Sequence, residues 1–176
     1  IQTVYTLEPS ASSAYYLYRL YSGRGDVDNA IKFLEEAISS EESDAAADAN
    51  YLFELAAFSF KNGKNAKAYE AAQKVVELNP EMAGKAYMLI GTIWGSTICG
   101  GNEIERRAPY WVAVDYMTKA KNADPSLTED ANNYIRQYSN YYPAASEAFM
   151  YDVVNGQSYT VSCGGMRAVT TVRTQR

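Results

Sequence analysis

The feature that most constrains the fold is an internal repeat of a helical pattern. A run of 13 residues that begins at Gly25 recurs after a shift of 38, so that Gly25 falls on Gly63 and Ala30 on Ala68. A second shift, of 45 residues, carries Ala68 to Ala113. Spacings of this size are typical of supersecondary units that stack in series, because one unit alone cannot bury its apolar face. The chain is therefore predicted to be a row of similar units.

Each unit reads as two helices joined by a short turn. The first helix carries apolar or small residues at helical spacing, such as Leu17 and Tyr18, which recur as Leu55 and Ala56. The second carries a small residue early, where neighbouring helices can approach closely. The predicted units span residues 11–42, 49–80 and 84–125, followed by capping helices over 128–155, so that residues 1–155 form one helical repeat domain.

The third unit and the C-terminus depart from this pattern. The first helix of the third unit is displaced by 35 residues and the second by 45, which places ten extra residues between them, predicted as a loop from Ser96 to Arg107. Residues 156–176 contain two β-branched runs around adjacent glycines, which predict a β-hairpin packed on the repeats. Residues 2–5 are a candidate strand that could pair with this hairpin.

The spacing resembles that of the tetratricopeptide repeat over roughly residues 11–155. The residues that carry the resemblance are the pairs Leu17-Tyr18, Leu55-Ala56 and Ile90-Gly91, the alanines Ala30, Ala68 and Ala113, and the prolines Pro80 and Pro125. The resemblance implies an all-α fold: a right-handed α-solenoid of about three helical hairpins plus a capping helix pair, here with a short C-terminal β-hairpin.

The C-terminal part resembles a narrower group, the cell-envelope tetratricopeptide proteins of gut anaerobic bacteria. The matching segments are residues 105–108, 111–115, 124–126, 141–143, 157–161 and 170–173. This resemblance implies a location in the bacterial cell envelope, in the periplasm, and a role in interaction without catalytic residues.

The residue inventory excludes several kinds of active site. The chain contains no histidine, so a Ser-His-Asp or Cys-His pair and a histidine-ligated zinc or haem are excluded. Two cysteines cannot close a four-ligand zinc site. We predict a protein that is not an enzyme and holds no metal or cofactor. An enzyme would instead use carboxylates or a Ser/Lys pair, and Glu103 with Asp115 is the candidate pair of facing carboxylates.

The charge distribution limits the partners. The formal net charge is −5, which disfavours nucleic acid, and no run approaches the roughly 18 apolar residues of a membrane span. Residues 26–54 hold nine acidic side chains and one basic, whereas Arg167, Arg173 and Arg176 follow the last acid. This asymmetry reads either as solvated surface or as weak, salt-sensitive self-association of the first repeat with the C-terminus of another copy.

Two features leave the cellular compartment open. Cys99 and Cys163 are expected to be free thiols; the alternative is a bridge that closes a long loop and stabilises the fold by about 3–4 kcal/mol. The sequence starts at Ile1 and not at Met, so a signal segment or an upstream region could precede it.

The first helices of stacked pairs line a concave face, and their side chains that do not pack inward are free to meet a ligand. The predicted ligand-binding residues are Tyr15, Arg19, Asn50, Phe53, Phe60, Lys85, Met88, Thr92 and Arg136. Aromatic rings supply apolar contact, and Arg or Asn fixes orientation. The competing interpretation of Tyr15, Phe53 and Phe60 is burial between helices. We predict a non-catalytic scaffold that binds a peptide or protein segment; the alternative is an envelope accessory protein for glycan or nutrient capture.

Overall fold

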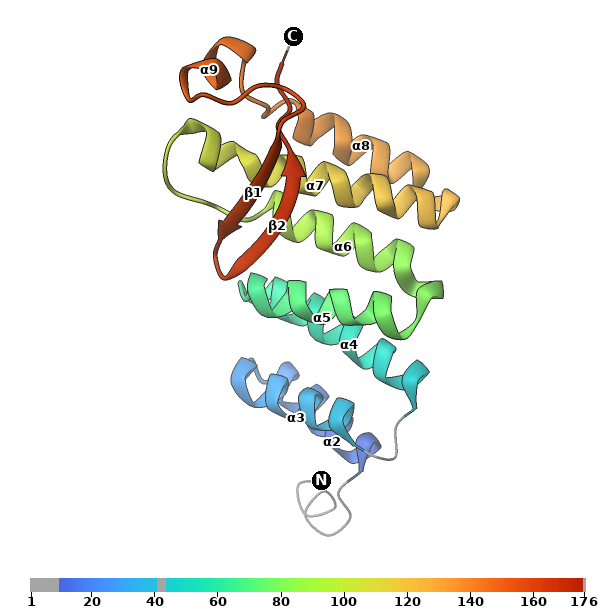
Figure 1. Cartoon of the computed structure of the whole chain (residues 1–176). Coiled ribbons are helices and arrows are strands. Elements are labelled where there is room, and N and C mark those ends of the chain that lie inside the picture. Colours follow the sequence, from blue (N-terminus) through green and yellow to red (C-terminus); the bar gives the residue numbers. More distant parts are fainter. Residues whose placement is uncertain (1–9, 41–43, 176) are drawn as a thin grey trace. The chain divides into compact units, whose positions relative to one another are not determined.

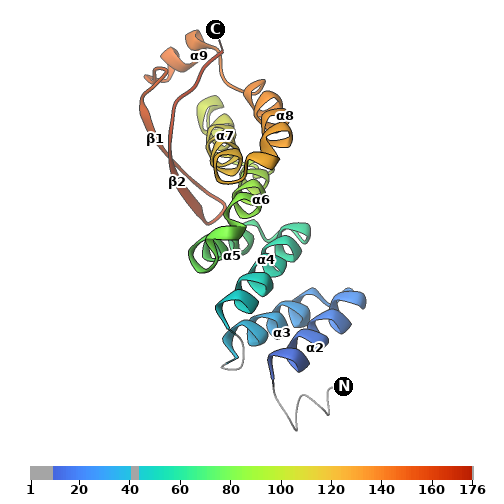
Figure 2. The ribbon, with the colours of Figure 1, turned by 90° about the vertical axis from the view of Figure 1, so that its right-hand side faces the viewer.

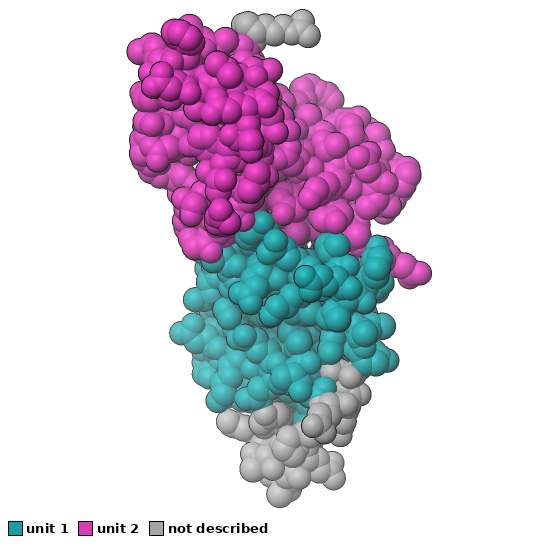
Figure 3. Space-filling view, viewed as in Figure 1, with its two compact units in different colours: residues 1–80 teal, residues 81–176 magenta. Residues whose placement is uncertain are grey.

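The computed structural model describes residues 10–40 and 44–175. Within these residues the chain forms eight α-helices, two short 3-10 helices and one two-stranded sheet (Figure 1). The chain divides into two compact units, which we call unit 1 (Ile1–Pro80) and unit 2 (Glu81–Arg176) (Figure 3). Each unit is built from antiparallel helical pairs.

Unit 1 consists of two helical hairpins. Their helices are α2 (Ala11–Gly23), α3 (Val27–Ser39), α4 (Ala45–Lys61) and α5 (Asn65–Leu78). Each hairpin turns at a glycine in the left-handed region, Gly25 with φ 78° and Gly63 with φ 77°, where a side chain would be strained. The predicted glycine turns are therefore where the two helices of each pair reverse direction.

The core of unit 1 forms where small and large side chains meet. Ala30 on α3 and Ala68 on α5, the repeat-equivalent alanines, are both 0% exposed. Leu17 and Leu34 are buried to the same degree. Small side chains at the contacts let the helix backbones approach, and the larger residues fill the remaining space at close-packed density. The sequence pattern thus predicts the packing of this unit correctly.

Unit 2 has a longer helical pair, two further helices and a sheet. After the 3-10 helix η1 (Pro80–Met82), its elements are α6 (Ala83–Gly95), α7 (Glu103–Ala123), η2 (Pro125–Leu127), α8 (Thr128–Ser139), α9 (Ala145–Met150), β1 (Ser158–Cys163) and β2 (Met166–Thr171). The 21-residue helix α7 is its centre, because α6, α8 and both strands all contact it. Trp94 on α6 and Trp111 on α7 are 0% exposed.

Close packing of α6 depends on its three glycines, and a β-carbon at Gly84 would lie 2.5 Å from Cβ of Asp124. A β-carbon at Gly91 would lie 3.1 Å from the carbonyl oxygen of Ala113 and 2.9 Å from Cε of Met117. A β-carbon at Gly95 would lie 2.4 Å from the ring of Tyr138. A larger residue at any of these positions would have to push its neighbours apart, and dense cores resist such shifts.

The strands form an antiparallel hairpin that lies along α7 (Figure 2). Gly164 and Gly165 make its two-residue turn, with φ of 61° and 78°. Positive φ at both turn positions matches the natural twist of paired strands. Val161 and Met166 are buried beneath the hairpin, as is Val172 just after it. A hairpin alone is marginally stable in water, so this packing is what stabilises it.

Polar contacts and a covalent bond also attach the hairpin. The indole Nε1 of Trp111 donates to the carbonyl oxygen of Arg173 at 2.9 Å, and the Arg173 guanidinium donates to the carbonyl oxygen of Trp111 at 2.9 Å. Asp115 accepts from the Thr170 hydroxyl and pairs with Arg173. These contacts join the end of β2 and the residues just after it to the middle of α7.

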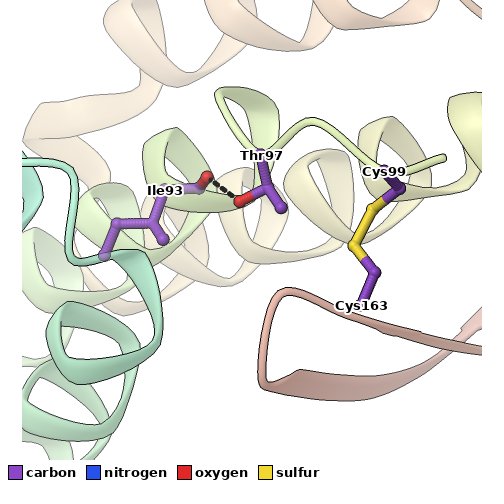
Figure 4. Close-up of a disulfide and its surroundings, with 4 residues drawn as sticks. All are labelled: Ile93, Thr97, Cys99 and Cys163. Carbon is purple, nitrogen blue, oxygen red and sulfur yellow. Dashed lines mark hydrogen bonds between the residues drawn. A yellow bond between two sulfur atoms is a disulfide. The ribbon is translucent and has the colours of Figure 1, made fainter.

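A disulfide between Cys99 and Cys163 fixes the other end of the hairpin (Figure 4). Cys99 lies in the loop between α6 and α7, and Cys163 ends β1. In the same loop, the Thr97 hydroxyl donates to the carbonyl oxygen of Ile93 at 2.7 Å. This hydrogen bond lies at the C-terminal end of α6. The expectation of free thiols was wrong, because the packing of the hairpin on α7 brings together two cysteines that are 64 residues apart in sequence.

The predicted fold class is confirmed in its helical hairpins and its C-terminal β-hairpin. The predicted loop from Ser96 to Arg107 is shorter, because α7 starts at Glu103. Asn102 and Glu105 form a capping box there: the Asn102 side chain accepts from the Glu105 amide, and the Glu105 carboxylate accepts from the Asn102 amide.

Two further predictions concern the domain boundary and the N-terminal residues. The division at residue 155 into a repeat domain and a hairpin stays a prediction, and the strand predicted at residues 2–5 lies outside the described residues. None of the helices in the two described ranges has the length and apolarity of a bilayer span.

Candidate functional site

In unit 1, the first helices of the two pairs share one surface. The Tyr15 hydroxyl on α2 donates to the Glu54 carboxylate on α4 at 3.1 Å, and the Tyr15 ring lies 5.2 Å from the ring of Tyr51. Beside this pair, the edge of one ring meets the face of the other between Tyr18 and Phe58, at 5.5 Å. We call Tyr15, Tyr18, Tyr51, Glu54 and Phe58 the α2–α4 surface.

Tyr15 and Tyr18 of this surface are held in the neutral form. Burial raises the pKa of Tyr15, and the hydrogen bond to Glu54 raises it further, while Arg19 opposes the change. Burial and the charge of Glu54 also raise the pKa of Tyr18 well above its ordinary value. Both hydroxyls are therefore hydrogen-bond donors at neutral and mildly alkaline pH.

A hollow of about 490 Å³ opens next to this surface on α2. Its lining residues are Ser12, Tyr15, Tyr16, Arg19 and Leu20. Tyr16 is 56% exposed, which is high for an aromatic ring, and Arg19 is exposed as well. Aromatic walls with one cation at the rim suit a side chain that has an apolar body and an acceptor group.

Tyr15 and Arg19 are the two predicted site residues that the structure brings together. Asn50 on α4 is exposed. Phe53 and Phe60 are half-buried, so part of each ring is covered and part is accessible. The α4 residues that contact Tyr15 are Tyr51 and Glu54, which the repeat register did not select. Glu54 carried a signal: it is the charged residue within the largely apolar run of residues 51–58.

The other four predicted residues lie in unit 2. Lys85 and Arg136 are exposed, and Met88 and Thr92 are half-buried. The Thr92 hydroxyl donates to the carbonyl oxygen of Met88 at 3.0 Å, and the Arg136 guanidinium donates to the Asn133 side chain at 3.0 Å. These bonds are local to α6 and to α8, and they do not join the four residues into one site.

The carboxylates considered for catalysis do not face each other. Glu103 pairs with Arg106 and Arg107 in the first turns of α7, and the Arg107 hydrogen bond lowers the pKa of Glu103. Asp115 lies 12 residues further along the same helix, about 18 Å away, and pairs with Arg173. Among the described residues, no group of acidic and cysteine side chains is arranged to hold a metal ion.

Sequence comparison agrees with the geometry of unit 1. The family model described as Tetratricopeptide repeat matches residues 19–44, from the end of α2 through α3. The match covers one repeat of unit 1. No curated protein sequence is significantly similar to the chain.

Solved structures with the tetratricopeptide fold match far more of the chain. The first TPR of Spaghetti (RPAP3), bound to the HSP90 peptide SRMEEVD, has 19% identity and a TM-score of 0.53 over 74% of this chain and 94% of that chain. The TPR2B domain of yeast Sti1, in a complex with pHsp70, has 21% identity and a TM-score of 0.54 over 74% and 96%. MamA has 17% identity and a TM-score of 0.54 over 80% and 83%. At these identities the likeness shows the tetratricopeptide fold.

Proposed function

We propose that the chain is a non-catalytic interaction scaffold that binds a protein segment on the α2–α4 surface. The observation that carries the proposal is the contact of Tyr15 with Glu54 and Tyr51, which joins two repeats into one aromatic and polar surface beside a hollow. Rigid aromatic rings give contact area at a low cost in conformational entropy. The surface is thus suited to holding a ligand.

The solved structures support this use of the fold. The Spaghetti domain is bound to an HSP90 peptide and the yeast Sti1 domain is in a complex with pHsp70, so two domains of similar fold bind other proteins or their peptides. In this chain, the bound segment would place an apolar side chain in the hollow and an acceptor oxygen on Arg19.

A photo-crosslinking experiment tests the proposal. A photoreactive amino acid replaces Tyr16, which is exposed in the hollow, and in a second protein it replaces Lys61, which is exposed at the end of α4. We expect a defined protein adduct from position 16 and not from position 61, and we expect Tyr15→Ala together with Arg19→Ala to abolish it at unchanged helix content. Equal adducts from both positions, or an adduct that survives the double substitution, would count against this surface.

We further propose that the scaffold works in the bacterial cell envelope, in the periplasm. The Cys99–Cys163 disulfide supports an oxidising compartment, because thiols in the cytosol are kept reduced. Alkylation of native cell fractions followed by mass measurement checks this. An oxidised chain in the periplasmic fraction agrees with the proposal, whereas a reduced chain in the cytosolic fraction contradicts it.

One observation favours the alternative of glycan capture. Tyr141 is 51% exposed, and its ring stacks on Tyr110 at 4.5 Å and 14°, so one face is supported and the other is open to a sugar ring. Because Trp94 and Trp111 are fully buried, calorimetry is a better probe than tryptophan fluorescence. Oligosaccharide binding that Tyr141→Ala removes would establish this function, and a flat titration would dismiss it.

A further inference from the structure

The β-hairpin of unit 2 has a free edge along β1. The amide of Val172 donates to the carbonyl oxygen of Gln157 at 2.8 Å, and the register pairs Tyr159 with Thr170. Alternate residues of an antiparallel strand point their amide and carbonyl groups to opposite sides. Tyr159 therefore turns these groups toward β2, whereas Thr160 and Ser162 turn theirs away from it.

These outward groups have no partner in the described part of the chain. Neither Thr160 nor Ser162 makes a hydrogen bond there, so two amides and two carbonyls face outward along one edge. Unpaired strand edges are templates for another strand, and proteins usually shorten, charge or cover them. On β1 the edge carries only small hydroxyl side chains, which leave the backbone accessible.

A hollow of about 250 Å³ runs along this edge. One wall is β1 from Tyr159 to Cys163, and the other is formed by Cys99, Gly100, Glu105 and Ala108. The disulfide closes one end, because it holds the Cα atoms of Cys99 and Cys163 5.9 Å apart, not far from the spacing of about 4.8 Å between paired strands. The disulfide thus ties the α6–α7 loop to the last residue of β1, and Thr160 and Ser162 line the hollow further along the strand.

The hollow has a distinct electrostatic character. Glu105 is the charged residue among the nine that line it, and no cation lines it with Glu105. One oxygen of its carboxylate accepts from the Asn102 amide at 3.1 Å, which fixes the side chain over the hollow. Burial raises the pKa of Tyr159 and Glu105 raises it further, which agrees with a carboxylate that lies close to β1. A cationic side chain would complement this wall.

We propose that the β1 edge is a second docking site, which takes an extended protein segment as an added strand with a lysine or arginine facing Glu105. The segment would pair its backbone with Thr160 and Ser162, and the charge would set its register. This site differs from the α2–α4 surface in location and in mode, because recognition here runs through backbone hydrogen bonds and not through an aromatic surface.

The test uses the full chain and a defined probe, the acetylated and amidated hexapeptide TVKVTV, with TVEVTV as its charge control. Hydrogen exchange and amide chemical shifts are followed by NMR. We expect TVKVTV to slow exchange of the Thr160 and Ser162 amides by about fivefold or more and to leave Val169, directly across the hairpin, unchanged. TVEVTV should bind at least about threefold more weakly, the size of an exposed ion pair.

Matched substitutions separate the edge from the hairpin as a whole. Thr160→Pro removes an outward amide of β1, and Val169→Pro removes the outward amide of β2 at the paired position, so both place the same strain in the hairpin. We expect the first to weaken TVKVTV binding about tenfold and the second to leave it unchanged. The Trp111 indole signal, whose proton is bonded to Arg173, reports whether the hairpin remains docked.

A third variant tests the proposal even if a proline substitution displaces the hairpin from α7. Glu105→Gln retains the capping box and should abolish the preference for TVKVTV over TVEVTV. Equal loss of binding in both proline variants, or an unchanged charge preference in Glu105→Gln, would overturn the proposal. Slow exchange of the Thr160 amide without any peptide would overturn it too, because the edge would then be covered by the chain's own N-terminal segment or by a second copy.

Discussion

Both units contain the same kind of helical pair, but they differ in one face of its second helix. This face is exposed to solvent on α5 of unit 1 and covered on α7 of unit 2. At repeat-equivalent positions, α5 of unit 1 has Ala66 and Glu70 where α7 of unit 2 has Trp111 and Asp115. The Glu70 side chain is 72% exposed and pairs with Lys74 on its own helix, whereas Trp111 is 0% exposed under the hairpin. Two substitutions on one helix face therefore turn a solvated surface into a surface that the chain itself must cover.

The difference extends to charge and to covalent bonds. Unit 1 has twelve acidic and seven basic residues, while unit 2 has nine of each and contains both cysteines and both tryptophans. In unit 2 the disulfide-linked hairpin covers this helix face, and we call it the cap of α7. We infer that the stability of unit 2 depends on its C-terminal segment, and that the stability of unit 1 does not.

Removal of the disulfide should have the largest effect. Cys99→Ser with Cys163→Ser opens a loop of 64 residues, for which chain entropy predicts a loss of about 4 kcal/mol. Tryptophan fluorescence reports on unit 2, because Trp94 and Trp111 both lie there. We expect the fluorescence transition in urea to move to a lower urea concentration. The circular dichroism signal of the helices should then show two steps, of which the one from unit 1 keeps its former urea concentration. A single shifted transition for both signals would show that the units are not independent.

The second prediction concerns the polar attachment of the hairpin. Asp115→Asn weakens the acceptor of Thr170 and leaves Arg173 without its counter-charge, so it should lower the stability of unit 2 by about 2 kcal/mol. The repeat-equivalent change Glu70→Gln removes an exposed ion pair and should cost less than about 0.5 kcal/mol. Urea titrations of the two variants give both values, and equal losses would refute the inferred role of the cap.

A third pair of variants compares helix packing in the two units. Gly91 in α6 corresponds to Ala56 in α4. Gly91→Ala would place a β-carbon 3.1 Å from the Ala113 carbonyl oxygen, so it should destabilise unit 2 by about 1–2 kcal/mol although alanine favours helices. Ala56→Gly should cost unit 1 about 2 kcal/mol, because it lowers helix propensity and also removes a fully buried methyl group. A more stable Gly91→Ala protein would mean that α6 can move away from α7 without cost.

The repeat pattern predicted the packing because it is local. Ala30, Ala68 and Ala113 recur at a fixed place in the second helix, and all three are 0% exposed. The helical start at Glu103 was also readable, since Asn102 and Glu105 have the spacing of a capping box.

The features that the sequence does not predict depend on contacts between helices and strands that are far apart in the chain. The contact of Tyr15 with Glu54 follows from the stagger between α2 and α4, which the repeat shift of 38 residues does not contain. The disulfide depends on a hairpin that folds over α7 from 64 residues away. The same packing pairs Arg173 with Asp115, so one of the three arginines on which the predicted self-association rested is already bound within its own chain.

Alkaline pH offers the smallest but most selective contrast between the units. Burial raises the pKa of Tyr138 in unit 2 to about 12, from an ordinary value of 10.0. The unfolded chain loses this proton first, so the stabilisation is complete below about pH 10, falls by about 1 kcal/mol at about pH 11, and is lost as the pH passes 12. Tyr138→Phe cannot ionise and should flatten this loss in the fluorescence transition. Tyr18→Phe, at a tyrosine of unit 1 whose pKa burial also raises, should leave that transition unchanged. If both variants flatten it equally, the alkaline titration does not distinguish the two units.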